Sequence, residues 1–131
     1  MSGSNSIIPE DWFTLAEQDL LAARLLLEQG GPLGIAAFHI QQTVEKSLKG
    51  YLLSTGWHLK RIHDLETLVQ EPAKHDSVFE KFLPACQKIT EYYVETRYPF
   101  AGASLLTEDE VRVSFAEAKQ LLAIIRDKIY K

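Results

Sequence analysis

Polar and basic side chains recur every three or four residues between positions 39 and 49 of the chain. This group comprises His39, Gln42, Glu45, Lys46 and Lys49. Such spacing places side chains on one face of a helix. On that face the lysine ammonium groups could bind phosphates, while His39 and Gln42 could hydrogen-bond a base or a sugar. The alternative is a solvated face in which Glu45 and Lys49 form an i,i+4 pair worth only ~0.3–0.5 kcal/mol.

A second candidate group lies in the aromatic and basic segment 57–63, which follows Gly56 and contains Arg61 and His63. We expect this segment to form a loop at the mouth of the same groove. Asp64 comes directly after His63, and its carboxylate has two interpretations. It could orient His63 as a general base, or it could cap the helix that follows.

Arg97 is a further candidate because it precedes Pro99, where a helix is expected to end. A guanidinium group makes bidentate contacts with phosphate, so Arg97 could close the groove from another side. Alternatively, its charge complements the carboxyl end of the helix. We expect the neighbouring Tyr92 and Tyr93 to pack in the core and in a dimer interface rather than to stack on bases.

The composition argues against several classes of site. A net charge of −4 disfavours sequence-independent nucleic-acid binding but leaves room for a local basic patch. Cys86 is the only cysteine, so no internal disulfide is available and a cytoplasmic protein is expected. No apolar run approaches ~18 residues, so no membrane span is expected. The sequence has no Walker loop, nucleophile elbow, dinucleotide fingerprint or metal-ligand spacing of histidines, and we therefore predict no cofactor and no metal.

The elements that must position these residues are helices, because apolar residues recur with a 3.6-residue period and strand-like alternation is scarce. After a leader over 1–8, expected to be disordered, a first helix should begin near Pro9 and stop at Gly30. A second helix should run from about Pro32 to Ser54. Its predicted apolar stripe consists of Ala37, Ile40, Val44, Leu48 and Tyr51.

Two helical stretches should follow the basic segment. The first is short and closes at Pro72. The second should begin at Asp76 or Ser77 and continue to about Thr96, with a kink or restart at Pro84, which lacks a backbone donor.

The capping-box sequence Thr107–Glu110 introduces the last helix, whose apolar residues are the most regularly spaced in the chain. Four long helices and one short helix, joined by brief turns, predict an all-α antiparallel bundle over residues 9–131.

Four segments in this order resemble the HEPN superfamily, in particular small prokaryotic HEPN proteins often encoded beside a minimal nucleotidyltransferase. The segments are Ala16–Leu20, Phe38–Lys49, His63–Leu65 and Thr96–Pro99. The resemblance implies a bundle of four or five helices, a homodimer, and a polar groove that binds nucleotides. It also implies a nucleotidyltransferase partner and a role in a toxin–antitoxin-like pair.

The sequence departs from the ribonuclease members of this family. Those members carry an arginine followed after four to six residues by a histidine, a pair suited to RNA cleavage because histidine exchanges a proton and arginine stabilises phosphate charge. No histidine follows Arg97, and neither Arg24 nor Arg61 has one at that spacing. We therefore favour a non-catalytic nucleotide- or RNA-binding module. The alternatives are an atypical ribonuclease using His39 or His63, and a purely structural interaction domain.

The complete predicted ligand-binding set is His39, Gln42, Lys46, Lys49, Arg61, His63 and Arg97.

Overall fold

The computed structural model describes residues 6–93 and 106–130, and all regular structure within these ranges is helical. The all-α prediction is confirmed. The elements are α1 (Pro9–Glu28), α2 (Leu33–Ser54), α3 (Leu65–Ala73), a 3-10 helix η2 (Ser77–Phe82), α4 (Leu83–Ile89) and α6 (Glu108–Ile129).

The helix ends follow from local sequence. Pro9 occupies the first turn of α1, where its missing N–H leaves no hydrogen bond unmade. Gly30 and Gly56 follow α1 and α2 with φ angles of 69° and 94°, a left-handed conformation that glycine adopts without a Cβ clash. Thr107 accepts a hydrogen bond from the Glu110 backbone N–H at 3.2 Å, which caps α6 as its sequence predicts.

The stretch between α3 and α6 is divided into shorter helices. The Asp76 carboxylate accepts from the Val78 N–H at 3.1 Å and so caps η2. The chain restarts as α4 at Leu83, which places Pro84 in a first turn, where a missing donor is tolerated. Residues 91–93 are helical again, and the remainder of the stretch predicted to reach Thr96 lies outside the described residues.

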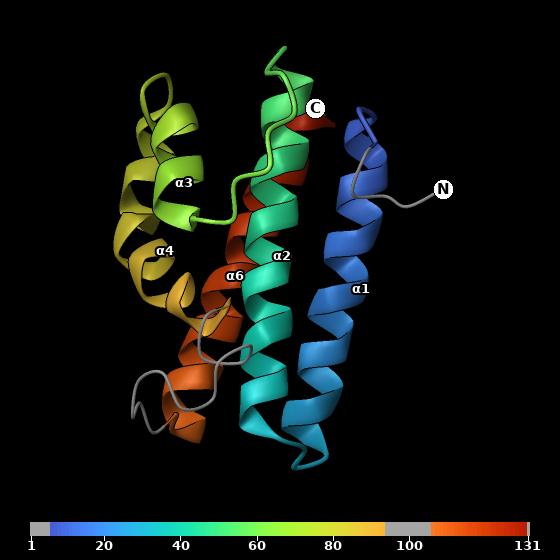
Figure 1. Ribbon diagram of the computed structural model, residues 1–131, viewed down its shortest axis with the longest axis vertical. Coiled ribbons are helices and arrows are strands. Elements are labelled where there is room, and N and C mark those ends of the chain that lie inside the picture. Colours follow the sequence, from blue (N-terminus) through green and yellow to red (C-terminus); the bar gives the residue numbers. More distant parts are fainter. Residues whose placement is uncertain (1–5, 94–105, 131) are drawn as a thin grey trace.

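The three long helices lie side by side, with α3 and α4 packed against α2 and α6 away from α1 (Figure 1). α1 runs in the direction opposite to α2 and α6, which run the same way (Figure 1). α2 contacts α1, α3, α4 and α6 and is therefore the central element. No helix of the described ranges is both long and apolar enough to cross a membrane.

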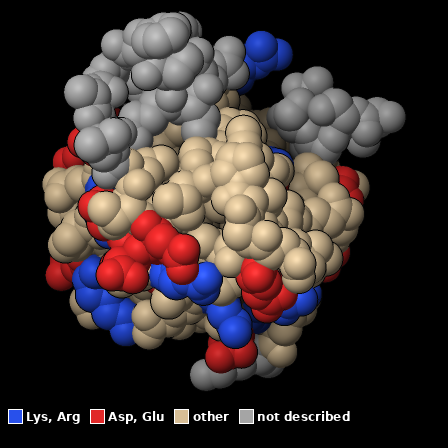
Figure 2. Space-filling model, turned by 90° about the horizontal axis from the view of Figure 1, so that it is seen from below, with Lys and Arg blue, Asp and Glu red and all other residues tan. Residues whose placement is uncertain are grey.

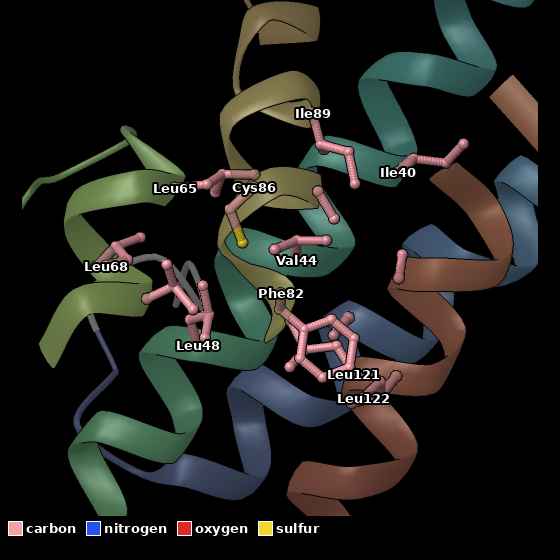
Figure 3. Packing of buried hydrophobic residues seen from close by; sticks show 14 of the residues in the cluster. Ile40, Val44, Leu48, Leu65, Leu68, Phe82, Cys86, Ile89, Leu121 and Leu122 are labelled. Atoms are coloured by element: carbon pink, nitrogen blue, oxygen red, sulfur yellow. The ribbon is translucent and has the colours of Figure 1, made fainter. Parts of the chain in front are cut away.

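The apolar stripe of α2 forms the centre of the core, as predicted (Figure 3). Ile40, Val44 and Leu48 are at most 2% exposed, and Tyr51 is half-buried against Phe79. The partners that converge on this stripe from α3, η2, α4 and α6 are Leu65, Leu68, Phe82, Cys86, Ile89, Leu121 and Leu122. Burial of each large side chain contributes roughly 1.5–3 kcal/mol, so this core fixes how α2 is oriented.

The amino-terminal leader is described only from Ser6. That residue is buried: its hydroxyl donates to the Asp11 carboxylate at 2.7 Å, and its carbonyl accepts from the Trp12 indole N–H at 2.8 Å. Residues 1–5, the greater part of the leader predicted to be disordered, lie outside the described residues.

Candidate functional site

The polar face of α2 is enclosed rather than solvated. Gln41, Glu45 and Lys49 are between 0% and 4% exposed, and Lys46 is only partly exposed. α1 covers one side of this face, and the connection from α2 to α3 runs back along the helix before α3 begins (Figure 1). The interpretation of Glu45 and Lys49 as an exposed pair is therefore wrong, because both side chains lie inside the molecule.

Asp19 of α1 holds two of the predicted residues. Its Oδ1 lies 2.8 Å from Nδ1 of His39, and its Oδ2 accepts a hydrogen bond from Nζ of Lys46 at 2.6 Å. The Asp19 side chain is 12% exposed, against 20% for Lys46 and 28% for His39. One nearly buried carboxylate thus brings a histidine and a lysine of α2 together.

Glu45 forms a second centre of the same kind. Nζ of Lys49 donates to its Oε2 at 3.0 Å, Nε2 of Gln41 donates to its Oε1 at 2.9 Å, and Nδ1 of His63 lies 3.0 Å from Oε2. Gln42 joins this network by donating from Nε2 to the Gln41 amide oxygen at 2.7 Å. Each of the two carboxylates therefore contacts one lysine and one histidine. We call this set the polar cluster: Asp19, His39, Gln41, Gln42, Glu45, Lys46, Lys49 and His63.

Both histidines are held through the same ring nitrogen. A carboxylate oxygen only accepts, so Nδ1 of His39 and of His63 must carry the proton in these contacts. Nε2 of each ring is left for another partner, and none is present within the described ranges. The carboxylates thus fix the ring orientation and leave one polar edge of each imidazole available.

Aromatic rings connect the two histidines. The His39 ring meets the Phe38 ring edge-on at 5.7 Å between centroids, and Phe38 stacks on Tyr93 at 6.4 Å. His63 also stacks on Tyr93, with the two ring centroids 5.0 Å apart and an interplanar angle of 10°. The prediction that Tyr92 packs in the core is confirmed, since it is 3% exposed and hydrogen-bonded to Ser114 at 2.9 Å.

Three further residues considered in the sequence are not among the members of the polar cluster. Arg61 is exposed and forms no ion pair within the part of the chain that the structure describes. Arg97 lies outside the described residues. Asp64 is a helix cap, because its carboxylate accepts from the Glu66 N–H at 3.2 Å and from the Thr67 hydroxyl at 2.7 Å. Glu45, and not Asp64, is the carboxylate that orients His63.

Asp19 and Gln41 are the members of the cluster that sequence reasoning missed. Asp19 had a detectable signal, because it falls between Ala16 and Ala23 on the buried stripe of α1, where a charge is out of place. No sequence signal pointed to Gln41, because glutamine is common at the boundary between two faces of a helix. Glu45 was noted only as the partner of Lys49.

Two surface grooves on the described part of the molecule are lined by residues outside the polar cluster. A groove of about 350 Å³ lies between α1 and α6, and another of about 400 Å³ lies between the ends of α2 and α3. No three His, Cys, Asp or Glu side chains converge in a metal-binding arrangement among the residues described. The end of the bundle seen in Figure 2 carries acidic and basic side chains intermixed, not a patch of one sign.

A family model and a similar solved structure name the same family. A family model described as "HEPN domain" matches residues 9–128. The chain is 28% identical over 140 residues to the protein named "Putative toxin MJ1304" of Methanocaldococcus jannaschii, covering 96% of this chain and 91% of that protein.

Two crystal structures have the same fold. The protein TT1696 from Thermus thermophilus superimposes with a TM-score of 0.80 at 28% identity, covering 92% of this chain and 97% of that chain. ST0689, an archaeal HEPN homologue, superimposes with a TM-score of 0.75 at 29% identity, covering 93% of this chain and 98% of that chain.

Proposed function

The chain belongs to the HEPN domain family, and from that premise we propose that it is a nucleotide- or RNA-binding module of a toxin–antitoxin-like pair. The name of its M. jannaschii relative supports the toxin part of this proposal. The binding part rests on the polar cluster.

The observation that carries the proposal is the pair of enclosed carboxylates, Asp19 and Glu45, each holding a lysine and a histidine. Transfer of such charges out of water is expensive, and well-packed apolar side chains of similar volume stabilise a fold equally well or better. A purely structural interface between α1 and α2 would therefore have no energetic need for these charges. The charges of the polar cluster point to a role beyond folding.

The chemistry that the cluster offers suits a phosphate-bearing ligand. Lys46 retains partial exposure, the Nε2 edges of His39 and His63 are available, and Arg61 precedes His63 by two positions. Lys46 and Arg61 can donate charge-assisted hydrogen bonds to phosphate oxygens. Nε2 of each imidazole, with the ring proton on Nδ1, can accept a hydrogen bond from a sugar hydroxyl or a base N–H. The Lys49 ammonium is enclosed at 5% side-chain exposure, so we assign it the role of holding Glu45, with Gln41 and Gln42 completing that support.

The proposal is tested by calorimetric titration of nucleotides and short RNAs against a Lys46→Gln/Arg61→Gln variant. Loss of two charge-assisted hydrogen bonds, worth roughly 1.5–3 kcal/mol each, should weaken binding about a hundredfold or more. The matched control is Lys74→Gln/Lys119→Gln, which changes the net charge equally at positions away from the cluster. Equal affinities for all three proteins, or no binding by the wild type at millimolar ligand, would refute the proposal.

We further propose that the protein acts as a homodimer with a minimal nucleotidyltransferase partner. Apolar side chains left on the surface of α1, such as Leu21 and Leu25 at 45% and 47% exposure, support an isologous contact. Light scattering at micromolar concentration should give the mass of a dimer. A monomer mass would contradict this part of the proposal alone.

An atypical ribonuclease is the second candidate function. The contact between Glu45 and Nδ1 of His63 favours it, because carboxylates orient general-base imidazoles in this way. We expect no cleavage, since the family's arginine-to-histidine spacing is missing. Metal-free cleavage of single-stranded RNA by the pure protein, abolished by His63→Ala, would establish this second function instead.

A further inference from the structure

We infer that His63 is a stacking platform for an unpaired nucleobase, which extends the row of rings formed by Phe38, Tyr93 and His63. This inference rests on the proposed function and names the part of the ligand that the exposed imidazole would receive. It adds a stacking contact with the base to the phosphate contacts of the proposed site.

The first supporting observation is the arrangement of the rings. Tyr93 stacks on Phe38 at an interplanar angle of 29° and on His63 at 10°. His63 stands at the end of this row within the described residues, and its side chain is 49% exposed. Tyr93 covers one face of the imidazole, and no second ring lies on the other face among the described residues. A planar ring placed there would continue the stack.

The second observation is that the imidazole is held in place before any ligand arrives. Nδ1 of His63 contacts both carboxylate oxygens of Glu45, at 3.2 and 3.0 Å. Glu45 is fixed in turn by Gln41 and Lys49. A half-exposed side chain normally loses conformational entropy on binding, and prior fixation removes that cost.

The third observation is the chemistry around the open face. Arg61 is exposed on the same connecting segment, two positions before His63, and its guanidinium is therefore the candidate partner for the phosphate of a base that stacks on His63. Nε2 of His63 can hydrogen-bond the sugar or the base edge. Aromatic and imidazole faces stack on unpaired bases with little sequence preference, so a nucleotide outside a duplex is the ligand class that fits.

The probe for this inference is 2-aminopurine, a fluorescent base that is quenched when it stacks. It is supplied as the free ribonucleoside monophosphate, in a short single-stranded RNA, and in the same RNA paired to its complement. We expect quenching with one or both unpaired probes and none beyond the intrinsic duplex level with the paired probe. Quenching of the free nucleotide identifies a mononucleotide site, and quenching of the RNA alone identifies an RNA site.

Three variants test whether His63 is the residue on which the base stacks. His63→Ala should weaken binding about five- to a hundredfold, the range measured for loss of one stacked base. His63→Phe keeps a planar ring and should keep most of the quenching. His75→Ala, at an exposed histidine outside the polar cluster, should behave as the wild type. Glu45 keeps Lys49 and Gln41 as partners in the alanine variant, and circular dichroism checks that its helices are intact.

The outcomes separate this inference from the proposed function. If the wild type binds without quenching, or if His63→Ala binds and quenches as well as the wild type, the stacking inference fails and the phosphate site stands. If His63→Phe loses as much affinity as His63→Ala, the ring face is not the contact and the inference also fails. If no probe binds, both proposals fail.

Discussion

Glu45 in the middle of α2 contacts Nδ1 of His63 with both carboxylate oxygens, although the two residues are eighteen positions apart. The contact joins the connection between α2 and α3 to a helix face that also receives α1. The Glu45 side chain is 6% exposed and the His63 side chain is 49% exposed, so the contact between them links the interior charge network to the surface.

Glu45→Gln should destabilise the protein strongly. The substitution leaves the Lys49 ammonium, only 5% exposed, without its counter-charge, and breaking a buried pair from one side costs about 3–5 kcal/mol. Urea unfolding followed by circular dichroism measures the loss. The control is Glu45→Gln/Lys49→Met, which removes both charges and should recover much of the lost stability. A double variant no more stable than the single one would show that the Lys49 charge is not the cause.

Gly50→Ala should also destabilise the protein, although alanine is the better helix former by about 1 kcal/mol. A Cβ at position 50 would lie 2.6 Å from Cε1 of Phe13, a fully buried ring with little room to move. Overpacking of this kind costs about 1–3 kcal/mol, which exceeds the helix-propensity gain for most of that range. Adding Phe13→Leu to Gly50→Ala should remove part of the clash. A thermal midpoint for Gly50→Ala at or above that of the wild type would contradict the close contact.

Cys86 should be inert in the folded protein. Burial raises the pKa of its thiol to about 12, with smaller contributions from the Glu117 and Asp64 charges, so almost no thiolate forms at neutral pH. A disulfide reagent at pH 8 should react slowly with the native protein and at the normal rate in concentrated guanidinium chloride. Rapid reaction of the native protein would show that the packing around Cys86 opens readily.

The ion pair between Asp76, which caps η2, and Lys128 of α6 should make stability depend on pH at both extremes. The hydrogen bond from Lys128, followed by that from the Val78 N–H, lowers the pKa of Asp76 from its usual 3.8. The stabilisation that the ionised Asp76 gives the folded protein is therefore present above about pH 4. It is lost as the pH falls through the lowered pKa of Asp76. The same hydrogen bond raises the pKa of Lys128 above 10.5. At high pH the stabilisation from the pair is therefore lost only as the pH rises through this raised pKa.

Asp76→Asn tests this pair because asparagine still caps η2 but carries no charge. The variant should be less stable than the wild type at pH 7, and the difference should shrink as pH falls below the pKa of Asp76. Lys128→Met should give a similar loss, and the two substitutions together should lose less than the sum of the single losses. Additive losses would show that the pair contributes nothing.

The sequence alone determined where the long helices begin or end and which apolar face of α2 is buried. Pro9, Gly30 and the Thr107 cap act on the backbone within a few residues, so their effects are visible without a tertiary structure. The apolar stripe of α2 is equally local, because the helical period alone places Ile40, Val44 and Leu48 on one side.

Only the tertiary structure decided what covers the opposite face of α2. Helical periodicity shows which residues share a face, but it carries no information on which distant segment lies against it. From the sequence, Glu45 and Lys49 could therefore be interpreted as a solvated pair. In the structure, α1 and the connection to α3 enclose them. Asp19 reaches its partners His39 and Lys46 across twenty and twenty-seven positions. Such a contact is set by the packing of α1 on α2, and no local pattern encodes it.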